Sequence, residues 1–211
     1  GNFYQTHTKS SAQAAEELLR DLPAVLDGVE DWQRAVLHND LPEWLQDFLV
    51  NSPYTFARTG MWWQSGAWRQ QESFACDDLE PMQIHQLRSI PMTLFFPRLS
   101  ESVMRGYAAS QRPDGFLAHV LGGGCFGPPP APSSTHGVFG PLSVELLAVD
   151  LWQMVRATNN SALLRDLWPV AQRVLRYRVE RARRLGLPEH LSSAYDWFGF
   201  TGRSTTTYTT F

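Results

Sequence analysis

Two acidic residues, Glu72 and Asp196, lie among aromatic residues, in surroundings that suit carboxylates used for chemistry. Glu72 stands in the stretch WRQQESF, and Asp196 stands in AYDWFGFTG. Burial among rings raises the cost of a charged carboxylate, so its pKa shifts and the group can hold a proton near neutral pH. Two carboxyl groups held apart at one sugar-sized site are the working parts of a glycosidase. The purely structural interpretation is that Glu72 ends a hairpin and Asp196 caps a turn.

Three segments around these carboxylates resemble glycoside hydrolase family 116, which includes the non-lysosomal glucosylceramidases. They are residues 83–99 (QIHQLRSIPMTLFFPRL), 151–169 (LWQMVRATNNSALLRDLWP) and 195–202 (YDWFGFTG). The first is similar to a family helix that runs from an Asp-Val-His motif into Trp-Pro-Lys-Leu. The second is similar to a family helix–turn–helix, and the third to the loop with the acid/base aspartate. The resemblance implies that Glu72 is the nucleophile and Asp196 the acid/base.

The same resemblance, which runs from about Leu41 to Phe211, implies a mainly α fold that is part of an (α/α)6 barrel, or toroid, with a short β-hairpin. Residues 1–211 would form the N-terminal portion of one glycosidase catalytic domain, truncated at Phe211. A β-sandwich domain would precede it, and the rest of the barrel would follow. We therefore expect apolar faces to be exposed where further helices would pack, and we expect the isolated segment to be inactive.

Further residues are candidates for sugar binding. His85 and Gln83 align with the Asp-Val-His motif, and His119 aligns with a family His-Asp-Ile-Gly loop. Asp78 belongs to an acidic cluster, Asp77, Asp78 and Glu80, that could contact sugar hydroxyls or could cap the helix expected after Pro81. Trp197 and Thr201 flank Asp196 in its loop. The bland alternative for His85 is a satisfied core histidine.

Departures from the family pattern point to an altered sugar preference. Gln83 stands where the family has Asp, and Val120 follows His119 where the family has Asp. We expect a retaining β-glycosidase, similar to β-glucosidases or glucosylceramidases, that acts on a β-linked glycoside or glycolipid by double displacement. The alternatives are a carbohydrate-binding pseudoenzyme and another (α/α)6 enzyme, either an inverting glycosidase or a lyase. The separation of the Glu72 and Asp196 carboxyls would discriminate a retaining glycosidase from these alternatives. We expect it below about 9 Å, near the roughly 5–5.5 Å of retaining enzymes.

Composition excludes some classes of function. The net charge of −3 gives no electrostatic footprint for nucleic acid. No cofactor or metal is expected, and the two cysteines, Cys76 and Cys125, lack metal-ligand spacing. The two cysteines could pair with each other, but free thiols are the expectation. This sequence contains no signal peptide and no membrane-spanning run. The location is therefore unknown from these signals, and a cytoplasmic or membrane-peripheral location is what the family resemblance implies.

Apolar spacing predicts helices almost throughout. Ser10 should cap a first helix that Pro23 kinks or divides, and Pro42 should start the next. Two short strands around the turn 64–66 should deliver Glu72 at the end of a hairpin. Helices are then predicted over 82–96, 98–112, 141–158 and 161–185, with a long Gly- and Pro-rich loop over 121–141.

Overall fold

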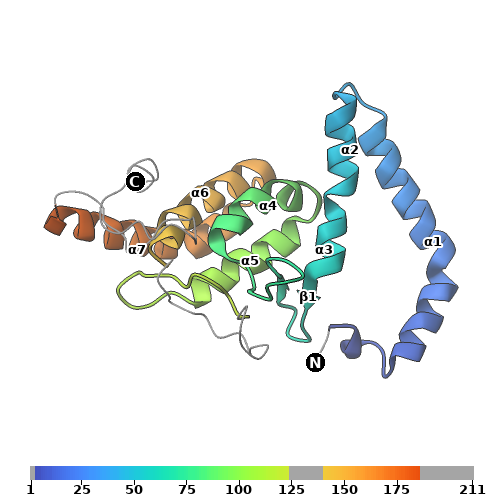
Figure 1. The fold of residues 1–211 in the computed structure, drawn as a ribbon, viewed down its shortest axis with the longest axis horizontal. Coiled ribbons are helices and arrows are strands. Elements are labelled where there is room, and N and C mark those ends of the chain that lie inside the picture. Colours follow the sequence, from blue (N-terminus) through green and yellow to red (C-terminus); the bar gives the residue numbers. More distant parts are fainter. Residues whose placement is uncertain (1–2, 124–139, 186–211) are drawn as a thin grey trace. The chain divides into compact units, whose positions relative to one another are not determined.

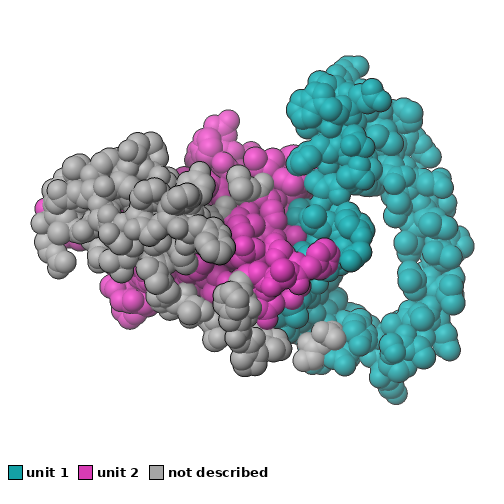
Figure 2. Space-filling view, viewed as in Figure 1, with its two compact units in different colours: residues 1–68 teal, residues 69–211 magenta. Residues whose placement is uncertain are grey.

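A computed structural model describes residues 3–123 and 140–185 of this 211-residue chain. Three candidate site residues, Asp196, Trp197 and Thr201, lie outside these ranges, as do Cys125 and most of the 121–141 loop. The chain divides into two compact units, residues 1–68 and 69–211 (Figure 2).

The described residues are mainly helical, as the sequence predicts. They form seven α-helices, one short 3-10 helix at Phe3–Thr6 and a two-stranded antiparallel hairpin (Figure 1). The helices are α1 (Ser11–Leu37), α2 (Glu43–Asn51), α3 (Pro53–Thr59), α4 (Met82–Phe95), α5 (Pro97–Ala109), α6 (Gly140–Thr158) and α7 (Ser161–Leu185), and the strands are β1 (Gly60–Trp62) and β2 (Trp68–Gln70).

The first unit begins with a long helix whose start the sequence specifies. Ser10 is the N-cap of α1, and its side chain accepts a hydrogen bond from the backbone N–H of Gln13, as predicted. Pro23 lies inside α1, which continues through it. Of the two predicted effects, a kink or a division, the division is therefore wrong. Much of the apolar face of α1 is exposed, including Leu18, Leu19, Leu22, Val25, Leu26 and Val29.

Helices α4 to α7 form the core of the second unit (Figure 1). Both α4 and α7 pack on α6, and α5 packs on α4 and α6. The core is built from apolar side chains of all four helices, namely Met92, Val103, Met104, Leu147, Leu151, Met154, Leu163 and Val174. Pro97 starts α5 directly after α4, one residue before the predicted start at 98, because proline is tolerated in the first helical turn.

A two-residue turn joins α6 to α7. Asn159 adopts the left-handed region at φ 52°, which asparagine tolerates better than most residues. The side chain of Asn160 then accepts a hydrogen bond from the backbone N–H of Leu163 at 2.9 Å, which caps the start of α7. This confirms the short turn predicted at these two asparagines.

Candidate active site

Glu72 follows the β-hairpin directly and begins a closed loop. Gln71 pairs with Leu79 in an isolated antiparallel bridge. Inside that bridge the N–H of Glu72 donates to the carbonyl of Asp78 at 2.8 Å, and the N–H of Ser73 donates to the carbonyl of Cys76 at 3.1 Å. Residues 72–78 are therefore tied at their base, and we call them the Glu72 loop. Glu72 itself is half-buried.

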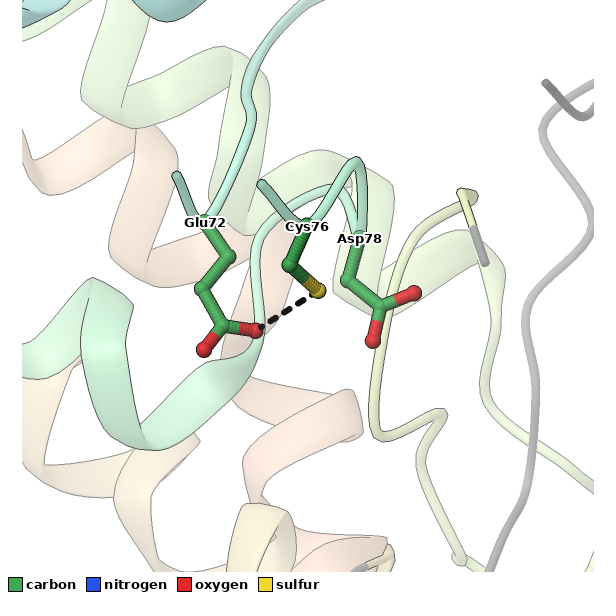
Figure 3. Close-up of side chains that lie close together, drawn as sticks. All are labelled: Glu72, Cys76 and Asp78. Atoms are coloured by element: carbon green, nitrogen blue, oxygen red, sulfur yellow. Dashed lines mark hydrogen bonds between the residues drawn. The ribbon is translucent and has the colours of Figure 1, made fainter. Parts of the chain in front are cut away.

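Three side chains of the Glu72 loop converge (Figure 3). The ligand atoms of Glu72, Cys76 and Asp78 all lie within 4.8 Å of one another, and the sulfur of Cys76 is 3.4 Å from Oε2 of Glu72. Cys76 is disulfide-bonded, so its sulfur carries no proton and cannot act as a thiolate ligand. The expectation of a free thiol is wrong for Cys76.

The segment around His119 is hydrogen-bonded to the base of the Glu72 loop. The N–H of Leu79 donates to the carbonyl of Gly122 at 2.8 Å, and the N–H of Leu121 donates to the carbonyl of Leu79 at 2.7 Å. The carbonyl of His119 accepts from the N–H of Met82, the first residue of α4, at 3.3 Å. The Glu72 loop, the start of α4 with Gln83, and the His119 segment therefore lie together.

Arg88 of α4 supplies positive charge beside this loop. Its Nη1 donates to the carbonyl of Gln71 at 2.8 Å. Burial lowers the pKa of Arg88, and attraction to Glu80, Tyr107 and Glu72 opposes that shift. Arg69, which is close to Glu72 in sequence, donates from Nη1 to the carbonyl of Ser102 on α5 at 3.0 Å.

Glu80 is the centre of a fully buried polar network. Its Oε1 accepts from the N–H of Gln70 at 2.7 Å, and its Oε2 lies 3.1 Å from Nδ1 of His85. Its backbone N–H donates to the carbonyl of Gln70 at 2.9 Å, and its own carbonyl accepts from the hydroxyl of Tyr107. Glu80 also adopts a left-handed φ of 52°.

The alternative that the acidic cluster caps a helix is wrong for α4. The N-cap of α4 is Pro81, and no side chain forms a capping hydrogen bond there. Glu80 joins β2 and α4 to each other instead, through Gln70 and His85. Glu80 therefore has a structural role, because it connects the strand before the Glu72 loop to the helix after it.

His85 also lines a pocket between α4, α5 and α6. The cavity has a volume of about 410 Å³, and its lining includes Ser89 and Thr93 of α4, Met104 of α5, and Asp150 and Gln153 of α6. Neither Glu72 nor Asp78 is among the described residues that line it. We call this cavity the His85 pocket.

Asp150 is the pocket residue that sequence reasoning missed. It is 3% exposed, and neither of its carboxylate oxygens has a hydrogen-bond partner among the described residues. Burial raises its pKa to about 6, and the charge of His85 acts in the opposite direction. A lone Asp within the apolar run of residues 146–151 (LLAVDL) was the available signal, because few residues of that run are expected to face water.

The candidate residues thus fall into four groups, one of which is His85 alone, buried beside Glu80 and lining the His85 pocket. Glu72 and Asp78 meet on one loop, and His119 lies in a segment bonded to it. Gln83 lies in the first turn of α4. Asp196, Trp197 and Thr201 are outside the described residues, so the expected separation of Glu72 from Asp196 stays a prediction.

No helix among the described residues combines the length and apolar character that crossing a membrane requires. Comparison with protein-family models and with curated proteins finds no match to this chain.

Proposed function

We propose that this chain belongs to a retaining β-glycosidase of the β-glucosidase or glucosylceramidase type, built on an (α/α)6 barrel. The proposal rests first on the resemblance carried by residues 83–99, 151–169 and 195–202. One structural observation supports it most. The Glu72 loop and the start of α4, which are close in sequence, are both hydrogen-bonded to the His119 segment, which is distant from them in sequence. These are the segments to which the resemblance assigns the nucleophile and sugar contacts.

In this proposal Glu72 is the nucleophile. Its carboxylate attacks the anomeric carbon while the bond from that carbon to the leaving oxygen breaks, which forms a covalent glycosyl-enzyme. The nucleophile must be ionised, and the positive charge of Arg88 beside the loop favours the ionised form. The tied base of the loop, from Gln71 to Leu79, limits the movement of the carboxylate, as well-aligned attack requires.

Asp196 is the proposed acid/base. It gives its proton to the leaving oxygen in the first step and takes a proton from water in the second, so that it ends each cycle protonated. Its neighbours Tyr195 and Trp197 provide an apolar setting of the kind that keeps a carboxyl protonated.

We assign the sugar contacts to Asp78, Gln83, His119, Trp197 and Thr201. Asp78 converges on Glu72, which suits a carboxylate that accepts hydrogen bonds from sugar hydroxyls (Figure 3). Gln83 replaces the family carboxylate with a neutral amide, which both donates and accepts, so we expect a sugar preference different from that of glucosylceramidases. His85 contributes indirectly, through its contact with Glu80.

Covalent trapping tests the proposal. Activated aryl 2-deoxy-2-fluoro-β-glycosides with glucose, xylose and N-acetylglucosamine-like rings are incubated with the protein, and intact mass and peptide mapping locate the label. We expect one sugar on Glu72 and none in Glu72→Gln. Glu180→Gln, a change at an exposed position of α7, is the matched control and should be labelled like the parent protein. Labelling that persists in Glu72→Gln would remove Glu72 from the mechanism.

A further inference from the structure

The His85 pocket contains three side chains whose hydrogen-bond acceptors lack partners. The acceptor atoms are Nε2 of His85, both carboxylate oxygens of Asp150, and Oε1 of Gln153, and each is shielded from bulk water. The other polar side chains in the lining are largely satisfied. Ser89 donates to the carbonyl of Gln86 at 2.9 Å, and the hydroxyls of Thr93 and Ser100 are 2.9 Å apart. The unsatisfied groups therefore come together in one cavity, from helices that pack against each other.

The hydrogen bond of His85 fixes which of its ring nitrogens is the acceptor. Glu80 Oε1 already accepts from the N–H of Gln70, and its Oε2 faces Nδ1 of His85 at 3.1 Å. An ionised carboxylate only accepts, so Nδ1 carries the proton and donates. In a neutral imidazole Nε2 then has a free lone pair, and His85 lines the same cavity as Asp150.

From this geometry we propose that the His85 pocket binds the primary ammonium group of a small organic amine with an apolar tail. An ammonium group has three N–H donors, which match the three acceptor side chains His85, Asp150 and Gln153. Its positive charge offsets the buried negative charge of Asp150, which has no ion-pair partner among the described residues.

The rest of the pocket suits the apolar tail. Ile90 and Leu94 of α4, Met104 of α5 and Trp152 of α6 line it. Its volume of about 410 Å³ is within the range of small-ligand sites, which is about 300–1,000 Å³, and far exceeds what a single ion needs. Ile90, Leu94 and Trp152 are each more than half exposed. Because the acceptors are shielded from bulk water, these rim side chains must move apart as the ammonium group enters.

The charges around Asp150 set the pH at which the amine binds. His85 approaches from α4, Tyr107 from α5, and Arg156 lies in the pocket lining on α6 itself. Arg178 of α7 is buried on the helix that packs against α6. Since burial raises the pKa of Asp150 to about 6, the carboxylate is ionised at pH 8 and protonated at pH 5.

Calorimetric titration with n-pentylammonium at pH 8 tests the proposal. The controls are 1-pentanol, which has the same tail without charge, and tetramethylammonium, which has the charge without N–H donors. We expect n-pentylammonium to bind at least tenfold more tightly than either. Asp150→Asn should abolish this preference and leave 1-pentanol binding unchanged, and lowering the pH to 5 should weaken the amine at least tenfold. Glu72→Gln should bind the amine like the parent protein, so the result is independent of the glycosidase proposal.

Three outcomes would overturn the proposal. They are equal binding of n-pentylammonium and 1-pentanol, unchanged amine binding in Asp150→Asn, and equal binding of tetramethylammonium. Zn²⁺ is titrated as a further probe. One Zn²⁺ per chain that is lost in Asp150→Asn and is not displaced by the amine would assign the pocket to a metal instead. Should Asp150→Asn not fold, Gln153→Met provides the same test, because it removes one acceptor with little change in side-chain volume.

Discussion

Nδ1 of His85 lies 3.1 Å from Oε2 of Glu80, and neither side chain is exposed to solvent at all. This pair joins α4 to β2, because the other oxygen of Glu80 accepts from the N–H of Gln70. It therefore holds the end of β2, which leads into the Glu72 loop, against α4. A buried pair of this kind is weak evidence of net stabilisation, but removal of one partner leaves the other unsatisfied.

Glu80→Ala should accordingly destabilise the protein. We expect the free energy of unfolding to fall by about 3–5 kcal/mol, because the variant leaves His85 and the Gln70 N–H without their acceptor. Glu80→Gln should cost less, about 1–3 kcal/mol, because an amide oxygen still accepts one of these hydrogen bonds. Urea denaturation measures both. Glu180→Ala, at an exposed position, should change stability by about 0.5 kcal/mol or less. An equally small effect of Glu80→Ala would show that the network is dispensable.

Asp150→Asn should stabilise the protein in a pH-dependent way. The folded-state pKa of Asp150 is raised to about 6 from an ordinary value of 3.8, so the folded state binds a proton more readily than the unfolded state. Protonation of Asp150 therefore makes its full contribution to the free energy of unfolding below about pH 4. This contribution is lost as the pH rises through about 6. A pKa raised by this amount corresponds to a loss of about 3 kcal/mol in the free energy of unfolding at pH 7–8.

Thermal unfolding of the parent protein and Asp150→Asn between pH 4 and 8 checks this sign. The variant should be more stable at pH 8, and the difference should shrink as the pH falls. The comparison cancels the titration of groups common to both proteins. A difference that does not depend on pH would mean that Asp150 is not the group that titrates near 6.

The sequence predicted most of the helices because their signals are local. The Ser10 cap, the Pro97 start and the Asn159–Asn160 turn each act on residues within one helical turn. Pro23 was misleading for the same reason. It removes one hydrogen bond from α1, but a 27-residue helix retains many others, so the helix continues through it.

The partners of the site residues could not be predicted, because they are set by packing between elements. Arg69 is close to Glu72 in sequence but bonds to Ser102 on α5, since alternate residues of a strand point to opposite faces. Arg88 reaches the loop because α4 folds back against it. Glu80 looks like a cap in sequence, yet its left-handed backbone turns it toward Gln70 and His85.

Gly123→Ala should loosen the Glu72 loop. Gly123 adopts φ 87°, and a Cβ atom there would overlap the carbonyl oxygen of Asp77 in the loop. We expect destabilisation of at least about 1–3 kcal/mol from backbone strain, with the overlap adding to it. In the glycosidase proposal, the rate at which the fluoroglycoside labels Glu72 should also fall.

Gly28→Ala is the matched control. Gly28 lies inside α1, and a Cβ atom there would meet nothing within 4 Å. Replacement should stabilise the helix by about 0.5–1 kcal/mol, because alanine loses less backbone entropy than glycine. Thermal unfolding of the two variants should therefore shift in opposite directions. A harmless Gly123→Ala would show that the loop does not depend on this close approach.

Asp196→Ala should separate the two steps of the proposed mechanism. Substrates with poor leaving groups need a proton on the departing oxygen, so their hydrolysis should nearly stop. Activated aryl glycosides need no such proton, so the first step should persist and the glycosyl-enzyme on Glu72 should accumulate. Azide should then restore turnover, because a small anion can attack the intermediate without the base that activates water.

The configuration of the azide product completes this test, which uses the intact protein. Two successive inversions at the anomeric carbon give a β-glycosyl azide, which NMR of the product identifies. An α-azide would mean a single displacement by an inverting enzyme, in which the carboxyls stand about 6.5–9.5 Å apart to admit water. Unchanged hydrolysis of poor substrates by Asp196→Ala would remove Asp196 from the acid/base role, whatever the role of Glu72.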